Sequence, residues 1–133
     1  MIDYALKISR ENGYNNIEYR LGDIQSPPID DNAVNLTILS QALHHTAKPQ
    51  IAINEAFRIT APGGRVVILD LLRHDFEQAR DLYADVWLGF TEIELREYLK
   101  KSGFISIQTA IVDKEQKAPH FETLMAIAMK MDN

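Results

Sequence analysis

Apolar and polar residues recur along the chain with two spacings, one typical of strands and one typical of helices. Two apolar runs rich in β-branched residues, AVNLTILSQ (33–41) and RVVILDLL (65–72), have the pattern of strands buried on both faces. Shorter runs bounded by turn residues predict three more strands. These are NIEYRLGD (16–23), FISIQTAIV (104–112) and TLMAIAMK (123–130).

Helical spacing of apolar residues fills the intervals between these runs. Thr91 and Glu94 form a capping box at the start of the last helix, and Gly103 is the expected stop. The order helix-strand-strand-helix-strand-helix-helix-strand-strand predicts an α/β fold, with a mostly parallel sheet and an antiparallel C-terminal strand. The helices are predicted over residues 2–12, 49–59, 75–87 and 92–102.

Length, charge and cysteine content narrow the class of protein. A chain of 133 residues suits a single domain over residues 1–133. A net charge of -5 without a basic cluster argues against a nucleic-acid partner. No apolar run reaches bilayer length, so no membrane segment is expected. Cysteine is absent, which excludes disulfides and thiolate zinc sites and fits a cytoplasmic location.

Two adjacent histidines, His44 and His45 in SQALHHTAKP (40–49), are the first candidate for chemistry. They could be metal ligands, a catalytic base or ordinary loop residues. Adjacent side chains in an extended segment or turn diverge, so we do not expect one metal ion to bind both. A base is compatible with the ordinary pKa of histidine, which lies near neutrality.

Two aspartates follow predicted strands and also have more than one interpretation. Asp23 stands in a Gly-Asp pair, which is common in turns. Asp70 closes the apolar run 65–72 and is either an exposed strand end or a substrate contact. The residues alone do not separate these alternatives.

The ordered series of blocks resembles a class I S-adenosylmethionine-dependent methyltransferase, of the type that includes the ubiquinone and menaquinone methyltransferases. The central block is NIEYRLGDIQSPPIDDNAVNLTILSQALHHTAKPQIAINEAFRITAPGGRVVILDL. More narrowly, LSQALHH, DLLRHD and VWLGFTEIELREYLKKSGF resemble the methyltransferase domains fused to ArsR-type regulators. The resemblance runs through the whole chain and implies a Rossmann-like sheet that binds its cofactor at the carboxyl ends of the strands.

The resemblance also implies roles for particular residues. It implies that Asp23 binds the adenine amino group of S-adenosylmethionine and that Ile24 packs against the ring. The methionine end of the cofactor would lie along Ser40, Gln41 and Ala42. The pocket for a small-molecule acceptor would be bordered by His44, His45 and Asp70.

One element of the family pattern is absent from the sequence. None of the six glycines forms the G-x-G-x-G loop that follows the first strand in such enzymes. We therefore expect a domain corresponding to the C-terminal two thirds of the family fold, without its first two strands. Strand edges without neighbours recruit partners, which predicts a homodimer formed through strand or helix contacts.

Two functional hypotheses follow from these observations. The first is methyl transfer from S-adenosylmethionine to an unidentified small acceptor, impaired because the glycine-rich loop is missing. The second is a non-catalytic, self-associating α/β module or a methyltransferase relic. The resemblance favours the first hypothesis, and the missing loop favours the second.

Overall fold

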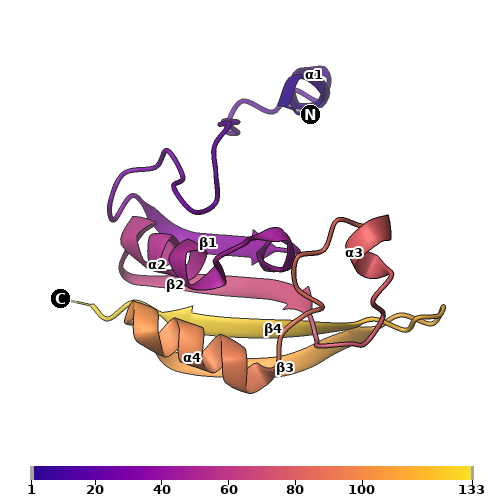
Figure 1. Cartoon of the computed structure of the whole chain (residues 1–133). Helices are drawn as coiled ribbons and strands as arrows, with labels where there is room; N and C mark the ends of the chain where they lie inside the picture. The colour runs from indigo at the N-terminus through magenta and orange to yellow at the C-terminus, as the bar shows by residue number, and fades with distance from the viewer. Residues whose placement is uncertain (1, 133) are drawn as a thin grey trace.

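A four-stranded mixed sheet forms the centre of the molecule in the computed structural model, which describes residues 2–132 (Figure 1). The strand order is β1-β2-β4-β3. The pair β1–β2 is parallel, and the pairs β2–β4 and β4–β3 are antiparallel. The strands are β1 (Val34–Ser40), β2 (Thr60–Leu71), β3 (Ile105–Lys114) and β4 (Glu122–Met129).

The α/β class is correct, and the antiparallel C-terminal strand is present as β4. The sheet is not mostly parallel, however, because only one of its three strand pairs is parallel. Parallel pairs need a crossover connection, and within the described residues only α2 provides one, between β1 and β2. The helical segments are α1 (Ile2–Glu11), η1 (Leu43–His45, a 3₁₀ turn), α2 (Pro49–Ile59), α3 (Ala79–Leu82) and α4 (Glu92–Ser102).

Helices α2 and α4 pack against one another and against a single face of the sheet (Figure 1). The core between them contains Val66 and Ile68 of β2, Ile53 of α2, and Leu95 and Leu99 of α4, all fully buried. The start of α4 is fixed as predicted, with Thr91 and Glu94 forming a complete capping box. Gly103 ends the helix in the left-handed conformation, as predicted.

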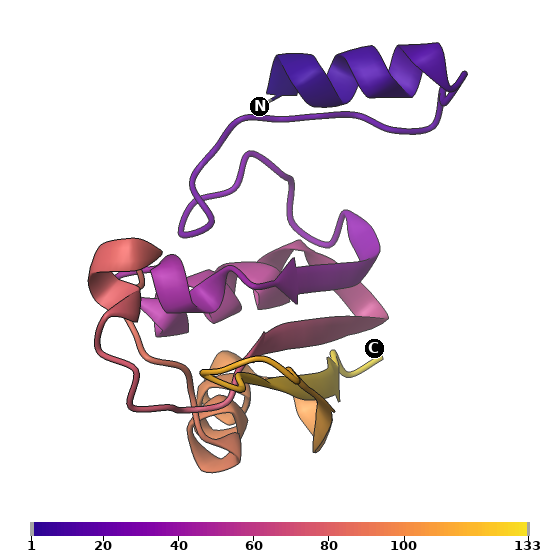
Figure 2. The same ribbon diagram turned by 90° about the vertical axis from the view of Figure 1, so that its right-hand side faces the viewer.

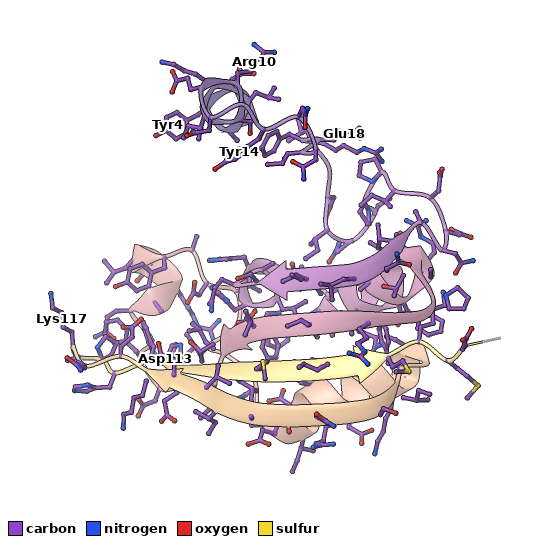
Figure 3. All side chains as sticks on the ribbon, turned by 180° about the vertical axis from the view of Figure 1, so that it is seen from behind. Tyr4, Arg10, Tyr14, Glu18, Asp113 and Lys117 are labelled. Atoms are coloured by element: carbon purple, nitrogen blue, oxygen red, sulfur yellow. The ribbon has the colours of Figure 1, made fainter. Side chains whose placement is uncertain are left out.

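The opposite face of the sheet carries no helix among residues 2–132 (Figure 3). The prediction that β1 and β2 are buried on both faces is therefore wrong. Side chains alternate between buried and partly exposed along β2. In β1 the apolar side chains of Leu36 and Ile38 are 52% and 56% exposed. The outer edge of β1 has no strand beside it in the part of the chain that the structure describes.

The N-terminal segment lies apart from the sheet. Two views at right angles show α1 well separated from the strands (Figure 2). A hydrogen bond of 2.8 Å between Ser9 Oγ and Tyr19 Oη joins α1 to the extended segment that follows it. Nearer the sheet, the guanidinium group of Arg58 donates hydrogen bonds to the carbonyl groups of Pro27 and Ile29 and fixes the approach to β1.

Two predicted elements do not form. Residues 16–23 make no strand, because no other strand lies beside them, and Leu21 is 86% exposed. The predicted helix 75–87 shrinks to α3, since the backbone turns at Ala84 with a φ of 56°. The following backbone N–H groups, of Val86 and Trp87, both donate to the carbonyl oxygen of His44 at 2.9 Å. Tertiary hydrogen bonding has thus replaced the helical pairing of this segment.

No helix in residues 2–132 has the length and apolar character required to cross a bilayer. The cytoplasmic location expected from the sequence stays a prediction.

Candidate functional site

The turn after β1 starts the site. Ser40 ends the strand, and Gln41 adopts a left-handed conformation with φ 55°, which is uncommon for a residue other than glycine. Its N–H donates to the carbonyl oxygen of Leu69 at 2.7 Å, so the turn stays attached to β2. The chain then enters the 3₁₀ turn η1, at the carboxyl end of the parallel strands. Open α/β sheets bind ligands at this end.

A buried carboxylate holds this turn in place. Asp70, one residue before the end of β2, is fully buried. Its Oδ2 accepts hydrogen bonds from the backbone N–H groups of Leu43 at 3.0 Å and His44 at 3.3 Å. Its Oδ1 accepts from the N–H of Leu71 at 2.7 Å and lies 2.7 Å from Nδ1 of His44. The interpretation of Asp70 as an exposed strand end is therefore wrong.

The imidazole of His44 lies between two carboxylates. A carboxylate only accepts, so the contact with Asp70 places a proton on Nδ1 of His44. The other ring nitrogen, Nε2, is 3.5 Å from Oδ1 of Asp85. Burial alone would lower the pKa of His44. The hydrogen bond to Asp70 and the charges of Asp70 and Asp85 together outweigh burial and raise this pKa above its ordinary value.

The imidazole of His45 also faces the carboxylate of Asp85. Nδ1 of His45 is 3.6 Å from Oδ1 of Asp85, and the two imidazole centroids are 4.1 Å apart. The expectation that adjacent side chains diverge in an extended segment or turn is wrong here, because the 3₁₀ turn η1 places the two rings side by side. His44 is buried, whereas the side chain of His45 is 44% exposed.

An open pocket of about 540 Å³ lies on the solvent side of this cluster. Its rim includes a turn in which Oδ1 of Asp23 accepts a hydrogen bond from the N–H of Gln25 at 2.9 Å. The side chain of Gln25 in turn accepts from the N–H of Lys48, which connects the turn to the start of α2. The lining residues are Gly22, Asp23, Ile24, Gln25, Ala42, His45, Thr46 and Ala47.

Half of the site residues predicted from the sequence line this pocket in the structure. Four of them line the pocket, namely Asp23, Ile24, Ala42 and His45. Ser40 and Gln41 are next to it at the end of β1 but do not line it. His44 and Asp70 are buried and are not among the lining residues.

Asp85 is the site residue that sequence reasoning missed. It lies in the segment predicted as the helix 75–87. In such a helix, an aspartate between apolar residues is expected on the polar face. The break at Ala84 turns the side chain inward instead, and it is 2% exposed. Figure 1 shows the short helix α3 and the chain after it beside the carboxyl ends of β1 and β2. No local sequence signal marks this contact.

Comparison with known proteins identifies the family. The family described as "Methyltransferase domain" matches residues 1–68 of the 133, and the chain belongs to this family. An arsenite methyltransferase of Halobacterium salinarum is 28% identical over 120 residues, which are 86% of this chain and 31% of that protein. A ubiquinone/menaquinone biosynthesis C-methyltransferase of Roseobacter denitrificans is 34% identical over 71 residues, which are 51% and 28% of the two chains. The chain thus spans less than a third of either relative.

Solved structures share the fold. A phosphoethanolamine N-methyltransferase of Haemonchus contortus, in complex with S-adenosylhomocysteine, matches 96% of this chain and 40% of its own, with a TM-score of 0.77 and 12% identity. A SAM-dependent methyltransferase of Aquifex aeolicus matches 94% of this chain and 62% of its own, with a TM-score of 0.63 and 17% identity. At this identity the likeness shows the Rossmann-like methyltransferase fold. The cofactor of the family is S-adenosylmethionine.

We predict that Asp70→Asn lowers the free energy of unfolding by about 3 kcal/mol or more. The amide nitrogen of asparagine cannot accept hydrogen bonds, and each buried donor left without an acceptor costs about 1–3 kcal/mol. Urea denaturation followed by circular dichroism measures the change. Asp113→Asn, at an exposed position of β3, is the matched control and should change the free energy by less than about 0.5 kcal/mol. Equal effects of the two substitutions would contradict the role of Asp70.

Proposed function

We propose that this chain contributes to a site at which S-adenosylmethionine gives its methyl group to a small acceptor. The observation that carries the proposal is convergence at the carboxyl end of β1. Asp23 and Ile24 come from one segment, and Ala42 and His45 come from the turn after the strand, yet all four line one open pocket. Family membership supports the same assignment.

The proposed cofactor contacts use groups that the fold leaves free. One carboxylate oxygen of Asp23 fixes its own turn, and the other makes no hydrogen bond within residues 2–132. That second oxygen can accept from an adenine amino group, while Ile24 offers an apolar surface to the ring. Ser40, Gln41 and Ala42 would lie along the methionine end of the cofactor. The described residues therefore fit one side of this cofactor.

The proposed acceptor pocket lies beside η1, where His45 lines the open pocket and His44 is buried behind it. In the reaction the methyl carbon leaves the sulfonium, its bond to sulfur breaks, and a bond to the acceptor nucleophile forms in line. The sulfonium is already an activated leaving group, so positioning and exclusion of water contribute most. Where the nucleophile carries a proton, the partly exposed imidazole of His45 can accept it. Asp70 acts behind His44 as a positioning residue.

We further propose that these 133 residues bind the cofactor weakly by themselves. Their six glycines include no G-x-G-x-G sequence, so the backbone donors that such a loop offers to the cofactor are missing. Each such hydrogen bond contributes about 0.5–1.5 kcal/mol, and about 1.4 kcal/mol corresponds to a tenfold change in affinity. Loss of several bonds gives a reduction on the order of a thousandfold.

Calorimetry with S-adenosylmethionine tests both statements. We expect no saturation at micromolar cofactor, and millimolar binding detectable by chemical-shift changes in NMR. Asp23→Ala should weaken that binding about tenfold, since it removes one charge-assisted hydrogen bond. Asp30→Ala, at an exposed position in the same segment, is the control that should bind like the unmodified chain. Low-micromolar binding would contradict the impairment, and an Asp23→Ala variant with unchanged binding would contradict the assigned site.

A second proposal is self-association as a homodimer, which one observation favours. The outer edge of β1 is unpaired in residues 2–132, and Leu36 and Ile38 lie exposed on the uncovered sheet face beside it. An apolar strand with a free edge is a template for a strand of another chain. A second copy supplies the same edge and the same apolar face, which gives a two-fold contact. In this reading the chain is a non-catalytic, self-associating module.

We predict a dimer by light scattering coupled to size-exclusion chromatography at micromolar concentration. Ile38→Lys should shift the equilibrium toward monomer, because it places a charge in the proposed contact. Ile93→Lys is the matched control, since Ile93 is exposed on α4, away from β1. A monomeric unmodified chain at this concentration would contradict the proposal, as would equal dissociation of the two variants.

A further inference from the structure

A buried oxygen without a hydrogen-bond partner lies at the centre of the histidine cluster. Oδ1 of Asp85 makes no hydrogen bond within residues 2–132, although its side chain is 2% exposed. Buried polar atoms are almost always paired, and an unpaired carboxylate oxygen costs more than a neutral group. Two ring nitrogens face this oxygen, at 3.5 Å for His44 and 3.6 Å for His45. Both separations exceed a normal hydrogen bond.

These separations match the spacing of ligands around a metal ion. Zinc binds histidine nitrogen and carboxylate oxygen at about 2.0–2.2 Å, so two ligand atoms at a tetrahedral angle lie about 3.4 Å apart. Donor atoms from His44, His45 and Asp85 all lie within 4.8 Å of one another. The ring nitrogens and the carboxylate oxygen are therefore at ligand distances from each other. Nδ1 of His45 is also 3.2 Å from the carbonyl oxygen of Ala84, and binding of an ion through this nitrogen replaces that hydrogen bond.

The orientation of His44 gives independent support. The N–H at Nδ1 of His44 donates a hydrogen bond to Asp70, which leaves the lone pair of Nε2 directed toward Asp85. Histidine ligands of metal ions characteristically donate a hydrogen bond from the N–H of their other ring nitrogen to a carboxylate in this way, which fixes the tautomer and raises ligand basicity. Asp70 is itself held by three backbone N–H groups, so the ligand is oriented before any ion binds.

We propose that His44, His45 and Asp85 bind a divalent transition-metal ion of the Zn²⁺ type, with Asp70 as the supporting carboxylate. Two imidazoles and one carboxylate are a ligand set suited to Zn²⁺ or Fe²⁺. Because His45 is partly exposed and lines the open pocket, the fourth coordination position faces solvent and takes water or an oxygen of a ligand. All four side chains are on this chain, so metal binding can be measured without the cofactor.

The experiment uses the full, tag-free chain at pH 7.5 without S-adenosylmethionine. Calorimetry with Zn²⁺ should give one ion per chain with micromolar or tighter affinity, and Co²⁺ should give visible absorption bands of low-symmetry coordination. Asp85→Asn and His45→Gln should each weaken binding by at least about tenfold, the lower end of what even a supporting residue contributes. His120→Gln, in the exposed connection between β3 and β4, is the control and should bind like the unmodified chain.

Several results would overturn the proposal. One is the absence of stoichiometric binding, and another is an unchanged affinity in His45→Gln. A third is a nitrogen NMR spectrum in excess Zn²⁺ that shows both ring nitrogens of His44 protonated, because the cluster would then be a charged histidine between two aspartates. None of these outcomes depends on methyl transfer, so failure here leaves the proposed function standing.

Discussion

The carboxylate of Asp70 is the interaction on which the rest of the site depends. It is buried at the end of β2, and it accepts hydrogen bonds from the turn after β1 through the N–H groups of Leu43 and His44. Hydrogen bonds to a charged group contribute about 1.5–3 kcal/mol each, which offsets the cost of burying the charge. The turn that results presents the carbonyl oxygen of His44 to residues 86 and 87, so the chain after α3 is also positioned by it.

A second constraint comes from the sheet, which helices cover on one face only within residues 2–132. Helices α2 and α4 provide that cover. They bury the apolar side chains that β2 and β4 direct toward this face, so the centre of the sheet is well packed. The other face and the outer edge of β1 have no such partner in residues 2–132, and the N-terminal helix lies away from them (Figures 1 and 2). The proposed chemistry and the proposed association thus have separate origins. The proposed site depends on the carboxyl ends of the strands, and the proposed association depends on the uncovered apolar surface.

The sequence predicts the elements whose stability is local or lies within the core. The capping box of Thr91 and Glu94 and the apolar run of β2 both form where the pattern indicates. Residues 16–23 alternate like a strand but have no neighbouring strand, and alternation describes a strand only where pairing exists. The proximity of His44 and Asp85 brings together residues 41 positions apart, through a break in a predicted helix. Such a contact depends on tertiary hydrogen bonds that periodicity does not report.

The central claim is that a buried Asp70 holds the turn after β1 rigidly, and amide hydrogen exchange measures this most directly. The account predicts that the N–H groups of Leu43 and His44 exchange nearly as slowly as those of the core strand residues Val66 and Ile68, because exchange then requires opening of the structure around Asp70. Exchange of these two amides as fast as the amides of the exposed residues 15–18 would contradict it.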